Sequence, residues 1–273
     1  MPLSAFLLAL AAAVLHAGWN VLLARARDVA AATTVALVLA VLLFAPVAVA
    51  TWDVDASAVP WIAASVALEI VYFVFLTTAY SRSDLTLVYP VARGSAPVLV
   101  LAGAAVTGAT IGLVQALGVL LVGGGILLVR GMTGQSDARG LFLALGIGAA
   151  IAGYTLVDKQ GVEHAAVIPY FELVLAPVAF AAMVWLAAMR RLPVARAELG
   201  WATLAAAVCA FAAYSLVLGA LTLASAPSVA AVRETSVLFA VALGASVLGE
   251  PVGRSRASGA VLVVAGVALV ALG

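Results

Sequence analysis

Two arginines stand inside apolar stretches of this sequence. Arg93 and Arg233 have the same separation along the chain as Trp61 and Trp201. A charged side chain inside a bilayer costs about 2.5–3.5 kcal/mol on insertion scales, so it usually faces a cavity or an opposite charge. The two guanidinium groups therefore predict gates or anchors for a carboxylate or phosphate on a small-molecule substrate. The alternative is snorkelling, in which the apolar stem is buried and the charged head reaches the interface.

Glu69 is the candidate for proton chemistry, because it lies near the middle of an apolar stretch. A carboxylate at that depth is expected to be either protonated or paired with a cation. We predict Arg93 as that cation, and we favour proton coupling over a purely structural ion pair. Glu234 directly follows Arg233, but adjacent residues do not share a helix face. A partner of Glu234 is therefore predicted on another helix.

Aromatic and small polar side chains near these charges could line a ligand site. His16 shares one helix face with its neighbours at i+3 and i+4. The second half of the chain repeats the aromatic and polar character of those neighbours, without the histidine. His16 is therefore interpreted as an interhelical hydrogen-bonding residue, and any of these side chains could also be ordinary core. The residues predicted to line the site are Trp19, Asn20, Tyr72 and Tyr154.

Composition indicates which solvent surrounds these residues. The 273 residues are 66% hydrophobic and 9% charged, with a mean hydropathy of +1.26, whereas a soluble domain is about half apolar and a quarter charged. The sequence therefore predicts a protein embedded in the lipid bilayer. A net charge of +1 argues against nucleic acid as a partner. The single cysteine, Cys209, excludes a disulfide within the chain, and no metal, redox or nucleotide motif calls for a cofactor.

Ten apolar segments are long enough to cross a membrane. A spanning helix needs about 20 mostly apolar residues, and its backbone must satisfy its own hydrogen bonds in lipid. The sequence thus predicts an all-α integral membrane fold of ten transmembrane helices, with no separate soluble domain. The segments are 3–23, 30–50, 60–80, 85–106, 111–129, 141–157, 165–189, 201–223, 229–248 and 257–272.

Positive charges are distributed unevenly between the loops. The loops on one side contain ten arginines, and the loops on the other side contain only Lys159. Because cytoplasmic loops carry an excess of Lys and Arg, we predict that the arginine-rich loops are cytoplasmic and that both termini are outside. Arg93 then lies toward the cytoplasmic side and Arg233 toward the external side. The loop arginines are Arg25, Arg27, Arg82, Arg130, Arg139, Arg190, Arg191, Arg196, Arg254 and Arg256.

The two halves of the chain resemble each other beyond the arginine and tryptophan pairs. Gly118 and Gly125 recur in the second half, with the same spacing, as Gly259 and Gly266. These glycines predict close helix packing, either between spans of one chain or at a homodimer seam. Each half has five spans, and this odd number inverts the second half relative to the first. Many secondary transporters have inverted repeats, with the substrate where the halves meet. The predicted repeats are residues 1–134 and 135–273.

A short motif near the C-terminus resembles a known family. Leu248-Gly249-Glu250-Pro251-Val252, followed by Gly259 and Gly266, is similar to the end of the EamA repeat of drug/metabolite transporters. The resemblance covers both five-span units, although Gly108 in the first half is followed by Ala109-Thr110 and lacks the acid. It implies a permease of the cytoplasmic membrane, often an exporter of amino acids, metabolites or toxic compounds.

Three classes of function can be weighed on these residues. We favour a secondary transporter that moves a small metabolite by alternating access, coupled to a proton or another ion because no nucleotide motif is present. An intramembrane enzyme would need convergent catalytic groups, which two distant histidines and one lysine do not supply. Channels usually form by symmetric assembly or carry rings of like residues. A passive channel or a non-transporting membrane subunit is therefore the alternative.

Overall fold

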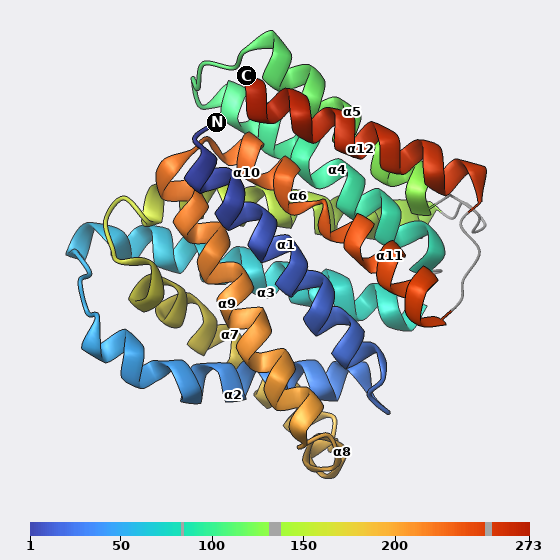
Figure 1. Cartoon of the computed structure of the whole chain (residues 1–273). Helices are drawn as coiled ribbons and strands as arrows, with labels where there is room; N and C mark the ends of the chain where they lie inside the picture. Colours follow the sequence, from blue (N-terminus) through green and yellow to red (C-terminus); the bar gives the residue numbers. More distant parts are fainter. Residues whose placement is uncertain (83–84, 131–137, 249–252) are drawn as a thin grey trace.

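The computed structural model describes residues 1–82, 85–130, 138–248 and 253–273, and most of this part of the chain is helical (Figure 1). The helices are α1 (Leu3–Ala24), α2 (Val29–Ala50), the short 3₁₀ helix η1 (Ala56–Ala58), α3 (Val59–Arg82), α4 (Leu85–Val106), α5 (Leu113–Arg130), α6 (Ala138–Gly161), α7 (Val167–Ala188), α8 (Leu192–Ala197), α9 (Trp201–Leu223), α10 (Ala226–Arg233), α11 (Ser236–Leu248) and α12 (Arg254–Leu272).

Eight helices in the described part are long and apolar enough to cross a membrane, namely α1, α2, α3, α4, α6, α7, α9 and α12. The chain is an all-α, multi-pass membrane protein, which confirms that prediction. Two predicted spans differ from the other eight. Segment 111–129 forms the shorter α5, and segment 229–248 is divided between α10 and α11. The predicted boundary between the two repeats, at residues 134 and 135, lies outside the described residues.

The spanning helices form because their residues are apolar on every face. Lipid and neighbouring helices then surround each segment, so no polar stripe is needed. Each helix satisfies its own backbone hydrogen bonds, as a bilayer requires. Asp28 begins α2 by accepting a hydrogen bond from the Ala31 amide at 3.0 Å, which satisfies one free donor of the first turn. Prolines occur inside α2, α4 and α7, where neighbouring helices can satisfy the freed carbonyl groups.

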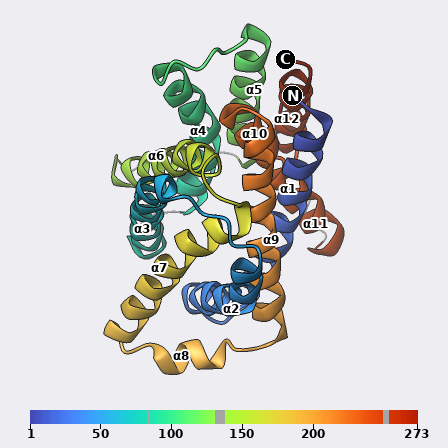
Figure 2. The ribbon, with the colours of Figure 1, turned by 90° about the vertical axis from the view of Figure 1, so that its left-hand side faces the viewer.

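Helices of the two halves are interlocked. Helix α1 packs on α9, α2 on α7, α3 on α6 and α5 on α12, while α4 packs on both α6 and α5. Figures 1 and 2 give two perpendicular views of this arrangement, in which neither half forms a separate body. The chain termini lie side by side, and the Met1 amino group donates to the Ala271 carbonyl at 2.9 Å. A site between the halves is therefore built from helices of both.

Glycines allow α5 and α12 to touch at their backbones. A β-carbon added at Gly118 would lie 2.7 Å from the Gly266 carbonyl oxygen, and one at Gly125 would lie 2.8 Å from the Gly259 carbonyl oxygen. These contacts make the two helices antiparallel. The predicted glycine packing thus occurs between spans of one chain. Helix α4 approaches α5 similarly, because a β-carbon at Gly94 would lie 3.0 Å from the carbonyl oxygen of Gly123.

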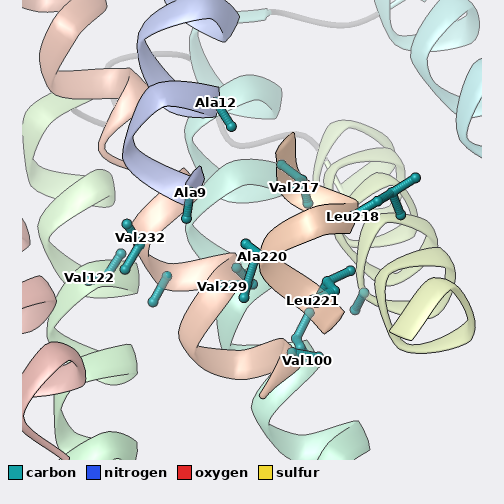
Figure 3. Packing of buried hydrophobic residues seen from close by; sticks show 14 of the residues in the cluster. Ala9, Ala12, Val100, Val122, Val217, Leu218, Ala220, Leu221, Val229 and Val232 are labelled. Carbon is teal, nitrogen blue, oxygen red and sulfur yellow. The ribbon is translucent and has the colours of Figure 1, made fainter. Parts of the chain in front are cut away.

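Loops of the two halves are joined at each end of the bundle. At the end with the arginine-rich loops, Asp28 forms an ion pair with Arg191, and its amide donates to Glu198 at 3.0 Å. At the opposite end, the α2–α3 and α6–α7 loops meet in an isolated bridge between Val54 and Ala165. The largest buried cluster lies between these ends, where both halves contribute side chains (Figure 3). Its labelled members are Ala9, Ala12, Val100, Val122, Val217, Leu218, Ala220, Leu221, Val229 and Val232.

Candidate functional site

The ninth predicted span is interrupted in its interior. Helix α10 ends at Arg233 and α11 begins at Ser236. At the break, the Thr235 amide donates to the Val232 carbonyl at 3.0 Å, which is a 3₁₀ step in place of an α-helical one. Tight turns of this kind inside a helix often mark functional positions, and broken helices carry ligand sites in transporters. The break places Glu234 in the interior of the bundle.

Glu234 joins the two arginines that the repeat singles out. Its Oε2 lies 3.3 Å from Nε of Arg93, and its Oε1 lies 3.7 Å from Nη2 of Arg233. The exposed fractions are 8% for Arg93, 4% for Arg233 and 0% for Glu234. We call these three residues the arginine cluster. It contains two positive charges and one negative charge, and the low dielectric around it leaves the excess positive charge poorly screened.

Two expectations about these arginines are wrong. Arg93 pairs with Glu234 instead of Glu69. Arg233 is not shallow, because its helix begins at Ala226 and places it eighth in α10. At about 1.5 Å per residue, both arginines lie about 12 Å into their helices. They therefore meet at one carboxylate instead of lying toward opposite sides, and their burial contradicts the snorkelling alternative. The predicted partner of Glu234 on another helix is confirmed.

Arg93 has further partners on three helices. Its Nη2 lies 2.9 Å from Nε2 of His16 on α1 and donates to Oγ of Ser236 on α11 at 3.2 Å. The ring of Tyr89, one turn earlier on α4, lies 5.9 Å from the guanidinium carbon. Because a guanidinium group can only donate, His16 accepts through Nε2 and is neutral here. His16 is thus an interhelical hydrogen-bonding residue, as predicted, and its partner is the site arginine.

A cavity of about 260 Å³ opens beside Arg93, between α1, α4 and α11. Its lining comes from the C-terminal half of α1 and the N-terminal half of α4. Both of these helix ends belong to the side that carries the arginine-rich loops, so the cavity opens toward that side. Asn20 lines it as predicted, while its amide also donates to the His16 carbonyl at 2.7 Å. The polar lining residues are His16, Asn20, Tyr89 and Ser236.

Packing is tight on the other side of the cluster. There α6 lies against α4 so closely that a β-carbon at Gly148 would lie 3.1 Å from the Ala92 carbonyl oxygen. Val100 on α4 and Val229 on α10 have no exposed surface, and Thr155 on α6 is buried as well. The arginine cluster is therefore approached by a cavity from one side and sealed by apolar packing on the other.

A second buried polar group lies on this sealed side. Asp158 on α6 has an exposed fraction of 0%. Its Oδ1 accepts a hydrogen bond from the Tyr170 hydroxyl at 2.8 Å, and its Oδ2 accepts one from Tyr214. Edge-to-face ring contacts continue from Tyr214 to Tyr154 at 6.1 Å and from Tyr154 to Tyr72 at 6.2 Å between ring centroids. Asp158 is thus linked, by hydrogen bonds and ring contacts, to tyrosines from four helices.

Residues 138–272 match the EamA-like transporter family. The second half of this chain belongs to that family. The resemblance predicted from the C-terminal motif is confirmed by this match, although residues 249–252 of the motif lie outside the described part. Members of the EamA-like family are membrane transporters of small molecules, and the multi-pass fold agrees with membership.

The fold of the whole chain is similar to that of solved structures. A crystal structure of a protein with 15% sequence identity superposes with a TM-score of 0.80, covering 100% of this chain and 98% of the other. It is one of 26 matching chains. At this identity the likeness establishes the fold alone. No curated protein sequence matches the chain.

The other predicted site residues of this EamA-family chain do not all lie at one place in the structure. Tyr72 and Tyr154 lie together in the tyrosine contacts described above. Trp19 packs its ring edge-on against His16, with centroids 5.1 Å apart, and contributes to an apolar cluster instead of the cavity lining. Glu69 lies on α3, and in the described part of the chain no basic nitrogen lies within 4.0 Å of its carboxylate. Among the described residues, no group of three or more His, Cys, Asp or Glu side chains could hold a metal ion.

Sequence reasoning missed two residues of this EamA site. Asp158 falls just beyond the predicted sixth span, which ends at residue 157, but α6 continues to Gly161 and buries it. Glu234 was assigned a partner on another helix but no place in the site. The available signal is an acid inside a predicted span, as for Glu234, or one residue past its end, as for Asp158. That signal does not say which side chains an acid meets, so only the three-dimensional packing distinguishes these two.

Proposed function

We propose that this EamA-family chain is a secondary transporter of a small metabolite that carries a carboxylate. The observation behind the proposal is the arginine cluster, in which two buried guanidinium groups share one carboxylate beside a cavity. An anionic group that enters the cavity would compensate the excess positive charge by contacting Arg93 with charge-assisted hydrogen bonds. His16, Asn20 and Ser236 would then contact the rest of the substrate.

Inverted repeats of five helices are supported by the helix pairing. In the register that aligns Arg93 with Arg233, α1 corresponds to α6 and α3 to α9. The pair α1–α9 therefore corresponds to α6–α3, and both pairs are packed. The glycine contacts follow the same correspondence. Gly118 corresponds to Gly259, and Gly266 corresponds to Gly125. The contact of Gly118 with Gly266 is therefore equivalent to the contact of Gly259 with Gly125. A pseudo-two-fold axis in the membrane plane would relate the antiparallel pair α5 and α12 in this manner.

Alternating access is supported by a departure from that symmetry. The cavity lies between α1 and α11, whereas the corresponding contact between α6 and α4 is closed. If α1 closed on α11 and α6 moved away from α4, the arginine cluster would become accessible from the other side. Two such arrangements of one scaffold are what alternating access requires. The loop connections at the two ends would remain as hinges.

The direction of transport that we propose rests on the placement of the arginine-rich loops. We place these loops in the cytoplasm and both termini outside the plasma membrane, because positive loop charges are retained inside. The open cavity then faces the cytoplasm. A carrier in this state accepts its substrate from inside the cell, so we infer an exporter.

Replacing Arg233 with alanine is expected to reduce export roughly tenfold or more. Removing one partner from a buried ion pair costs about 3–5 kcal/mol, and the substitution leaves Glu234 with Arg93 as its one remaining ion-pair partner among the described residues. The measurement is an untargeted comparison of metabolites inside and outside cells that express the wild type, the Arg233→Ala variant or no transporter. Arg196→Ala serves as the control, because Arg196 is an exposed arginine on α8.

The expected result is a carboxylate-bearing compound that accumulates outside cells with the wild type and the control, but not with Arg233→Ala. Accumulation inside the cells would reverse the direction and make the protein an importer. Equal export by Arg233→Ala would remove Arg233 from the site. Flux of the identified compound should also saturate and be stimulated by unlabelled compound on the other side, since a passive channel does neither.

Cysteine labelling tests both the orientation and the open side. Ala240 lines the cavity, whereas Val100, which corresponds to it in the register of the two arginines, has no exposed surface. In a Cys209→Ala background, we expect an Ala240→Cys variant to react with a membrane-impermeant thiol reagent from the cytoplasmic side. A Val100→Cys variant should be protected from that side. Labelling of Ala240→Cys from the external side only would contradict the proposed orientation, and equal labelling of both variants would contradict the one-sided cavity.

A further inference from the structure

The acids on α3 and α6 form a second polar group, apart from the arginine cluster. Asp158 is fully buried, and Glu69 lies on α3, the helix that packs on α6. We propose that Asp158 and Glu69 together form a proton-binding site, which holds one proton in the state described here. This inference rests on the proposed function, because the proton would be the ion coupled to substrate movement.

Asp158 has hydroxyl groups around it and no cation beside it. Tyr170 and Tyr214 donate to its two carboxylate oxygens, and the Ser65 hydroxyl on α3 is buried without a hydrogen-bond partner. In the part of the chain that the structure describes, no basic nitrogen lies within 4.0 Å of Asp158. The adjacent Lys159 turns away to the Leu221 carbonyl at 2.8 Å. A buried acid without a cation partner either remains charged at a high cost or binds a proton.

Glu69 is the second acid of the proposed proton site. Ser65 and Glu69 are four residues apart on α3, so they share one helix face. That face packs on α6, where the Leu68 side chain would lie 3.2 Å from a β-carbon at Gly153. Glu69 therefore lies on the face of α3 that meets α6, the helix that carries Asp158.

The charges of the arginine cluster and of the two proposed proton-binding acids balance with one bound proton. Two arginines and three acids, Arg93, Arg233, Glu234, Asp158 and Glu69, would carry a net charge of −1 if all were ionised. One proton shared by Asp158 and Glu69 makes the set neutral, which a low-dielectric interior favours. An anionic substrate beside Arg93 adds negative charge and strengthens proton binding. By linkage, the proton strengthens substrate binding equally.

The groups that face the proposed proton site come from every helix around it. Their hydroxyl, carboxyl and guanidinium groups determine the pH at which the site loses its proton. Water that reaches the site would have to pass them. They are Ser65 and Glu69 on α3, Tyr154 on α6, Tyr170 on α7, Tyr214 on α9 and Arg233 on α10.

Infrared spectroscopy of the purified full-length protein in lipid tests the site without a known substrate. A protonated carboxyl group has a carbonyl stretch that is lost when the group ionises. We expect such a band in the wild type and expect it to disappear as the pH is raised. Asp158→Asn should remove or halve the band, and Glu69→Gln should change the pH at which it disappears. Glu163→Gln is the control, because Glu163 is an exposed acid near the end of α6 and should leave the band unchanged.

Tyr170→Phe keeps the test decisive if Asp158→Asn does not fold. Loss of a hydroxyl that donates to the ionised carboxylate should move the disappearance of the band to higher pH. A band that is unaffected by all three interior substitutions would overturn the proton site and leave the carrier proposal standing. If the band behaves as expected but Glu69→Gln changes neither transport nor its pH dependence, the coupling role would be overturned instead.

Discussion

Replacing Glu234 with glutamine should destabilise the folded protein by about 3–5 kcal/mol, the usual cost of removing one partner from a buried ion pair. Glu234 is the carboxylate shared by Arg93 and Arg233, and all three side chains are buried. Without its charge, two guanidinium groups would face each other in a medium of low dielectric, where their repulsion is poorly screened. Thermal unfolding of the detergent-solubilised variant measures this loss.

The same variant should be rescued by small carboxylates. An anion that enters the cavity beside Arg93 can replace the missing charge, so acetate or a longer monocarboxylate should raise the unfolding temperature of Glu234→Gln more than that of the wild type. Glu163→Gln is the matched control, because Glu163 forms an exposed i, i+4 pair with Lys159. Such pairs contribute about 0–1 kcal/mol, so this control should unfold like the wild type. Equal unfolding temperatures for Glu234→Gln and the wild type would contradict the charge-sharing interpretation.

Replacing Gly259 with alanine should disrupt the contact between α5 and α12. The added carbon would lie 2.5 Å from the Val129 amide nitrogen and 2.6 Å from the Gly125 carbonyl oxygen. These are backbone atoms, so no side-chain rotation relieves the overlap. Inserting a carbon into a packed interior costs about 1–3 kcal/mol or more, and we expect the upper part of this range. Size-exclusion profiles of the solubilised variant, recorded after heating, should lose the folded peak at a lower temperature.

Gly124→Ala provides the control for this experiment. Gly124 is also a helical glycine of α5, but a β-carbon there would have no atom within 4 Å. Alanine forms helices better than glycine by up to about 1 kcal/mol, so this variant should be as stable as the wild type or slightly more stable. If Gly259→Ala lost its folded peak at the same temperature as Gly124→Ala, α5 and α12 would be able to move apart without loss of stability.

The fold was largely predictable because lipid imposes simple rules. Apolar length identified eight spans directly, and the recurrence of Gly118 and Gly125 marked helices that touch closely. The ninth span was misread at its start, because the apolar pattern begins at residue 229 while the helix begins at Ala226. A proline at its second position was the available sign. That small error at the start of the span was enough to make Arg233 look shallow.

The residues of the site were easier to predict from the sequence than the contacts between them. The repeat identified Arg93 and Arg233, but pairing depends on side-chain reach and helix rotation, which spacing does not encode. Arg93 was therefore assigned to Glu69 when Glu234 is its partner. Asp158 could not be recognised without knowing that Tyr170 and Tyr214 converge on it from separate helices. Trp19 and Asn20 both have helical-neighbour spacing from His16, yet only Asn20 lines the cavity, because the position of a neighbouring helix decides which side chain borders it.

The single carboxylate between two arginines has a consequence for how such a chain can evolve. In the register that aligns the two arginines, the position of Glu234 corresponds to Gly94, where contact with α5 leaves little room for a side chain. A dimer of identical five-helix proteins would hold two acids at this position or none. Two acids would neutralise both arginines, and none would leave two opposed cations. Only after duplication could the two copies diverge to keep one acid, and each copy then depends on the other for a balanced site.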